Sequence, residues 1–191
     1  MGKERVLAMT DGVVAIIITI MVLELKAPHG VDFEALRELL PVFFAYALSF
    51  IYVAIYWNNH HHFFHLVRRV DGVVMWANFH LLFWMSLIPF ATVWLGEHEF
   101  APVPTAVYGV SLFMPAVAWK IMQTAIIRVP GNGSLQAALG SDLKGKISPV
   151  LYLSGVALSF VAPWASLLCY LAVAAFWVIP DRRVERLMAP D

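Results

Sequence analysis

The stretch from Arg5 to Lys26, RVLAMTDGVVAIIITIMVLELK, decides the fold class of this chain. Its run from Gly12 to Leu25 is apolar apart from one threonine and one glutamate, and it approaches the roughly 20 residues that cross a bilayer as a helix. Polar groups at membrane depth are costly. Asp11 and Thr19 therefore indicate either a path for something polar or contacts with neighbouring helices.

The composition predicts an all-α integral membrane protein. Of 191 residues, 61% are hydrophobic and only 14% are charged, well below the quarter typical of a soluble domain. The apolar runs predict one transmembrane domain over residues 1–191. Its six spans are expected at about 6–26, 36–66, 73–95, 104–127, 147–161 and 164–179.

The basic residues predict the orientation in the membrane. With six spans, ten of the thirteen Lys and Arg residues share one side: Lys3, Arg5, Arg68, Arg69, Arg128, Lys144, Lys146, Arg182, Arg183 and Arg186. The positive-inside rule then places both termini of this multi-pass cell-membrane protein in the cytoplasm. The formal net charge of zero gives no electrostatic case for a nucleic-acid partner. Cys169 is the only cysteine, which excludes an internal disulfide.

The first predicted helix carries a narrow aliphatic stripe with a single hydroxyl. At 100° per residue, one face holds Met9, Gly12, Ile16, Thr19, Ile20 and Leu23. Periodicity alone is also consistent with ordinary helix packing. Asp11 points away from this stripe, and we expect it either at the membrane boundary or against Trp57 and the histidines of the second helix.

The second predicted helix contains YWNNHHHFFH, in which His61 and His65 stand one turn apart. That spacing is able to bind zinc, but no acidic or cysteine partner lies in the same helix. We therefore favour histidines that hydrogen-bond between helices, with Asn78 and His80 of the third helix as partners, and expect neither a metal nor a cofactor.

The chain lacks several familiar functional motifs. It has no TVGYG-type carbonyl filter, no Walker loop, no nucleophile elbow and no zincin motif. The sequence therefore gives no basis for an enzyme.

The opening of the first helix resembles a known family. The run RVLAMTD is similar to the Arg-x-x-x-Phe-Ser-Asp mark of transmembrane protein 175 type potassium channels, in their short single-repeat form. Arg5 and Asp11 fit that mark, while Met9 replaces Phe and Thr10 replaces Ser. The resemblance continues through SFIYVAIYWNNHHHFF and WANFHLLFWMSLIPFAT; the second half matches only by hydropathy and helix count.

The resemblance implies a homotetramer of six-helix subunits whose first helices line a central pore for potassium ions. Ile16 would form the narrowest ring, with further rings at Ile20 and Leu23 and a potassium-preferring hydroxyl layer at Thr19. The same resemblance implies a network that holds the first helix against the second and third, made of Arg5, Thr10, Asp11, Trp57, His60 and Asn78.

These observations predict a potassium-preferring cation channel with a hydrophobic constriction, whose partners are copies of itself and the lipid bilayer. The alternative is a proton-coupled secondary transporter that uses Asp11 and the histidines of the second helix, although inverted repeats with broken helices are not evident. A metalloenzyme built on His61 and His65 ranks last, because no acidic partner is present beside them.

Overall fold

The computed structural model describes residues 2–133, 135 and 143–178, and all of the regular structure in these ranges is helical. The all-helical prediction is confirmed. The elements are α1 (Lys3–Leu23), α2 (Phe33–Glu38), α3 (Leu40–Leu66), α4 (Gly72–Met85), α5 (Ile88–Glu97), α6 (Pro102–Arg128), α8 (Leu143–Leu158) and α9 (Pro163–Val178).

Four helical segments of the described chain are long and apolar enough to cross a membrane by length and composition. They are α1, α3, α6 and the pair α4 and α5, taken together as Gly72–Glu97. The other two predicted spans correspond to α8 and α9, which have 16 residues each. The count of six spans stays a prediction, and the C-terminal arginines used for the orientation lie outside the described residues.

Prolines mark the places where the predicted spans are divided. The span expected at 36–66 is split between α2 and α3, with Pro41 in the first turn of α3. The span expected at 73–95 is split at Ser86 and Leu87, and Pro89 lies in the first turn of α5. Proline lacks an N–H and is tolerated in a first turn, where that donor has no intrahelical partner. Pro115, by contrast, lies inside the unbroken α6.

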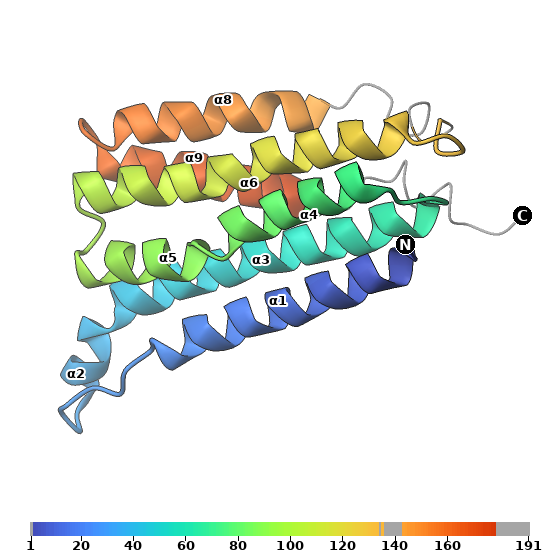
Figure 1. Cartoon of the computed structure of the whole chain (residues 1–191). Helices are drawn as coiled ribbons and strands as arrows, with labels where there is room; N and C mark the ends of the chain where they lie inside the picture. The colour runs from blue at the N-terminus through green and yellow to red at the C-terminus, as the bar shows by residue number, and fades with distance from the viewer. Residues whose placement is uncertain (1, 134, 136–142, 179–191) are drawn as a thin grey trace, which may run out of the picture.

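The long helices lie side by side in a bundle (Figure 1). Helix α1 forms one outer edge and packs on α3, α4 and α5, whereas α8 forms the opposite edge with α9 behind α6. The start of α1 lies at the same end of the bundle as the end of α3 and the start of α4. Helix α2 lies at the other end, away from the bundle.

Buried side chains form two clusters. The first joins α1 to α3, α4 and α6, and the second joins α3, α5 and α6 to α8 and α9. Within the second cluster, Gly109 and Gly155 leave the space that the ring of Tyr170 fills, because a Cβ at either position would collide with that ring. Small residues let membrane helices approach closely, and van der Waals packing then stabilises them. The bundle therefore fixes α3 and α4 as the support on which α1 lies.

Candidate ion pathway and its anchoring network

Helix α1 has one buried face. It consists of Val6, Thr10, Val14, Ile17 and Met21. These residues recur every three or four positions, so they lie on one side of the helix, and this side packs on the bundle. The opposite side of α1 is consequently left uncovered by the described residues of its own subunit.

The predicted constriction residues lie on that uncovered side. The exposed fractions are 57% for Ile16, 43% for Ile20 and 78% for Leu23. Thr19 is exposed as well, and its hydroxyl donates to the carbonyl oxygen of Ile16 at 2.9 Å. Because the only hydroxyl hydrogen is used in this bond, the lone pairs of Thr19 Oγ1 remain available to a donor or a cation. The uncovered side therefore offers aliphatic surface and one layer of oxygen acceptors.

A buried hydrogen-bond chain joins α1 to α4 and α3. Asn78 Nδ2 donates to Thr10 Oγ1 at 3.0 Å, and the hydroxyl of Thr10 donates to the Val6 carbonyl at 2.9 Å. On the other side of the same amide, Asn78 Oδ1 lies 2.8 Å from His60 Nε2. An amide oxygen only accepts, so His60 Nε2 carries the proton in this contact. One asparagine therefore ties three helices together.

A second contact attaches a neighbouring side of α1, about 100° around the helix from Thr10. Trp57 Nε1 of α3 donates to the carboxylate of Asp11 at 2.8 Å. Hydrogen bonds to charged groups are stronger than neutral ones, although this one lies at an exposed position. The two contacts limit rotation of α1 about its own axis, and they orient the aliphatic stripe away from the bundle.

Lys3, which sequence reasoning treated only as an orientation signal, is the third attachment of α1. Its ammonium donates to the carbonyl oxygens of Phe64, His65 and Val67 at 3.3, 3.4 and 3.1 Å. These carbonyls end α3, where the helix dipole favours a cation. Arg5 is exposed, and its side chain makes no hydrogen bond or ion pair with the described residues. Its place in the network stays a prediction.

The comparisons with known proteins decide the family. A model of the family described as "Endosomal/lysosomal potassium channel TMEM175" matches residues 5–89. A potassium channel of Chryseobacterium sp. (strain P1-3) is 51% identical over 187 residues, which is 97% of this chain and 97% of that relative. This chain belongs to the TMEM175 family.

Two further comparisons cover nearly the whole length. A potassium channel of Chamaesiphon minutus is 33% identical over 90% of this chain and 92% of that relative. The crystal structure of a lysosomal potassium-selective channel TMEM175 homolog from Chamaesiphon minutus superposes with a TM-score of 0.77 and 29% identity. It covers 93% of this chain and 96% of that chain. The likeness in sequence and in structure therefore extends to α8 and α9, beyond residues 5–89 of the family match.

The residues matched by the TMEM175 model contain every predicted site residue, from Arg5 to Asn78. They include α3, α4 and all of α1 except its first two residues. The family match of this TMEM175 protein thus covers the Asn78 and Trp57 contacts, whereas Lys3 lies just before it.

The histidines weighed as a zinc site lie outside the Asn78 chain. Nε2 of His61 and Nε2 of His65 are 3.0 Å apart, on a side of α3 that is partly open to the surroundings. Among the described residues, no group of three or more His, Cys, Asp or Glu side chains is placed to hold a metal. His80, the other expected partner, instead accepts from Trp84 Nε1 at 2.8 Å within α4.

A second buried polar cluster was missed by the sequence reasoning. Thr92 donates to the Ile88 carbonyl at 2.7 Å, so its oxygen accepts from Ser49 at 2.6 Å. The Ser49 oxygen in turn lies 2.9 Å from the hydroxyl of Tyr108 and accepts from it. The sequence could have predicted this cluster from the hydroxyl groups on three apolar helices, because such groups need hydrogen-bond partners inside a membrane protein.

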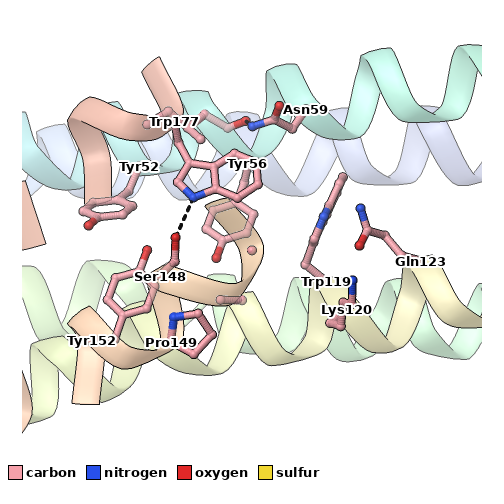
Figure 2. Close-up of a pocket in the computed structure, with 13 residues that line it drawn as sticks. Tyr52, Tyr56, Asn59, Trp119, Lys120, Gln123, Ser148, Pro149, Tyr152 and Trp177 are labelled. Carbon is pink, nitrogen blue, oxygen red and sulfur yellow. Dashed lines mark hydrogen bonds between the residues drawn. The ribbon is translucent and has the colours of Figure 1, made fainter. Parts of the chain in front are cut away.

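A narrow cavity lies elsewhere in the bundle, between α3, α6, α8 and α9 (Figure 2). Its volume is about 50 Å³, and aromatic rings form much of its wall. Trp177 Nε1 donates to Ser148 Oγ at 2.9 Å across one side. At the other end, the buried Gln123 Oε1 receives no hydrogen bond from the described protein atoms. A cavity of this volume admits water, which would donate to that oxygen. None of its lining residues belongs to α1, so the cavity is separate from the aliphatic stripe.

Proposed function

We propose that this protein is a potassium-preferring cation channel in which copies of α1 surround a common axis. The observation that carries the proposal is the division of α1 into two faces. One face is buried and hydrogen-bonded to α3 and α4, whereas the aliphatic face with its single hydroxyl is left uncovered. The naming of full-length relatives as potassium channels supports the same function.

The proposed assembly is a homotetramer of single-domain subunits, residues 1–191, each with six membrane spans. Both termini lie in the cytoplasm, as the distribution of basic residues favours. Symmetric closure is the usual arrangement for copies that meet through one repeated surface. In this assembly each subunit presents its uncovered α1 face to the others.

The proposed constriction consists of rings of aliphatic side chains. Ile16 forms the narrowest ring, and Ile20 and Leu23 form wider rings towards the outer mouth. Apolar walls do not replace the hydration shell of an ion, so a narrow ring of this kind closes the pathway by dewetting. Conduction then requires a state in which the rings are wider.

The proposed source of selectivity is Thr19. Its hydroxyl hydrogen is directed to the Ile16 carbonyl, which leaves oxygen lone pairs facing outward from α1. Potassium loses its hydration water at a lower cost than sodium. A layer of weakly coordinating hydroxyls in a narrow passage therefore favours potassium modestly, without a cage of carbonyl oxygens.

The alternative function, a proton-coupled transporter, requires proton transfer between Asp11 and the histidines of α3. Among the described residues, the Asp11 carboxylate accepts from Trp57, and no hydrogen bond joins it to a histidine. We therefore retain the transporter only as an outcome of the experiment.

The test is a reversal-potential measurement on the purified chain in a planar bilayer, with opposed potassium and sodium gradients. The channel gives stepwise currents that reverse towards the potassium equilibrium potential. A current that reverses at the sodium potential would overturn the potassium preference. Saturable uptake that depends on a proton gradient, without current steps, would overturn the channel in favour of the transporter.

A further inference from the structure

One face of α3 carries an aromatic and imidazole stripe next to α1. Trp57, His61 and His65 follow one another at intervals of four residues, so they lie above one another on the same side of the helix. The Trp57 ring stacks on His61 with centroids 5.7 Å apart and an interplanar angle of 22°. Trp57 anchors α1 through its hydrogen bond to Asp11, whereas the two histidines have no part in the proposed pore.

The contact between the histidines is not required to satisfy buried groups. His61 is half-buried and His65 is exposed, so water is able to serve either ring. In the neutral pair, one Nε2 donates its proton and the other accepts it. The stripe nevertheless directs both Nε2 atoms at one another, 3.0 Å apart, beside open space.

Contrary to the expectation from the sequence that no metal binds here, we propose that His61 and His65 form a two-imidazole binding site for a divalent first-row transition-metal ion. Two metal–nitrogen bonds of about 2.0–2.1 Å place their nitrogens about 2.9 Å apart at a right angle and about 3.4 Å apart at the tetrahedral angle. The observed 3.0 Å lies within this range, so the two nitrogens need little movement to reach one ion. Cu²⁺ leads the affinity order for nitrogen ligands.

Metal binding at this site changes no oxidation state and exchanges only ligands. The ring that donates through Nε2 shifts its proton to Nδ1, which frees the Nε2 lone pair. Two metal–imidazole bonds then replace two metal–water bonds, and the remaining positions keep water. Neutral rings release no net proton in this exchange.

The surroundings make the ion exchangeable rather than structural. Among the described residues, no third His, Cys, Asp or Glu completes the pair. The Lys3 ammonium, which donates to the His65 carbonyl oxygen at 3.4 Å, adds positive charge nearby. Structural metal sites use four protein ligands and catalytic ones use three, so a two-ligand site binds more weakly than either.

The test uses the full chain in lipid nanodiscs, titrated with Cu²⁺ while tryptophan emission is recorded. We expect saturable quenching, in part of Trp57, because its ring stacks on His61. His61→Gln or His65→Gln should weaken binding at least tenfold. The matched control is His62→Gln. Its ring lies edge-on to that of His61 with centroids 5.9 Å apart, but its side chain leaves the helix about 100° from that of His61, so the change should alter affinity less than twofold. Trp57→Phe should reduce the quenching and leave the number of bound ions unchanged.

Paramagnetic resonance of bound Cu²⁺ gives a second readout. The wild-type spectrum should show two coordinating nitrogens, and the spectrum of His61→Gln should show one. Elution of each variant at the wild-type position in size-exclusion chromatography establishes that it is folded. Equal Cu²⁺ affinity in the double variant His61→Gln, His65→Gln and in the wild type would overturn the site. Equal loss of affinity in His62→Gln would also overturn the pairing proposed here.

Discussion

Asn78 uses both ends of its amide to join three helices. Its Nδ2 donates to Thr10, its Oδ1 accepts from His60, and only 2% of the residue is exposed. Interhelical bonds in membranes average less than 1 kcal/mol each, but a buried polar group left without a partner costs about 1–3 kcal/mol. Asn78 therefore stabilises the protein mainly by keeping Thr10 and His60 paired, and less through the net energy of its two hydrogen bonds.

We expect Asn78→Leu to lower the free energy of unfolding by about 1–3 kcal/mol, because Thr10 and His60 lose their partner. Thermal unfolding in detergent measures the change. Asn59→Leu is the matched control, since within the described chain the Asn59 amide donates to the Ile55 carbonyl of its own helix and to no other helix. Equal loss of stability in the two variants would contradict the interhelical role of Asn78.

Thr19 is the one hydroxyl on the uncovered stripe of α1. We expect Thr19→Val to lower the potassium-to-sodium permeability ratio several-fold, because valine keeps the shape and removes the oxygen acceptor. Thr19→Ser should retain most of the ratio. Thr124→Val is the control, since Thr124 is exposed and its hydroxyl donates to the Lys120 carbonyl in a comparable local bond. Reversal potentials in mixed gradients measure the ratio; an unchanged ratio in Thr19→Val would exclude the hydroxyl layer.

At the scale of the element, α1 places the adjacent Ile16 and Ile17 on different faces. Ile16 is 57% exposed in the subunit and Ile17 only 3%. Consecutive helical residues differ in direction by about 100°, so one face packs on the bundle while the other remains free. Substitutions at these two positions therefore distinguish an effect on conduction from an effect on stability.

We expect Ile16→Ala to raise potassium flux through reconstituted vesicles, because a smaller side chain widens the apolar ring and reduces dewetting. Its unfolding temperature should change little. Ile17→Ala should instead lower the free energy of unfolding by about 2–5 kcal/mol through the cavity it leaves. A flux assay and a thermal unfolding curve on each variant test this division, and the reverse pattern would place the pathway on the other face of α1.

At the scale of the whole molecule, the described part of one subunit leaves the aliphatic face of α1 uncovered. The anchoring contacts with Asn78, Trp57 and the end of α3 all lie on other sides of α1. Association of copies through the uncovered face completes the proposed pore.

Disulfide cross-linking tests that association. In a Cys169→Ser background, which removes the only native cysteine, Ile16→Cys should give covalent dimers on oxidation. Disulfides form where Cα atoms approach within about 7 Å, as neighbouring copies do at a narrow ring. Ile17→Cys, which is buried within the subunit, should give none. Dimers from both positions, or from neither, would exclude the proposed arrangement of α1 around a shared axis.

The sequence by itself determined the helical class and the division of α1 into faces. Both follow from local properties, because apolar run length and 3.6-residue periodicity are readable along the chain. The resemblance also implied Arg5, Thr10, Asp11, Trp57, His60 and Asn78 as a group. Hydrogen bonds join all of these except Arg5 among the described residues, and the functional role of the group stays a proposal.

Only the tertiary structure decided which polar atoms meet. It placed Lys3 rather than Arg5 on the carbonyls that end α3, and it gathered Ser49, Thr92 and Tyr108 from three helices. The physical reason is that a side chain reaches only about one turn along its own helix. Longer-range partners depend on the register and approach of neighbouring helices, which packing sets across the whole bundle.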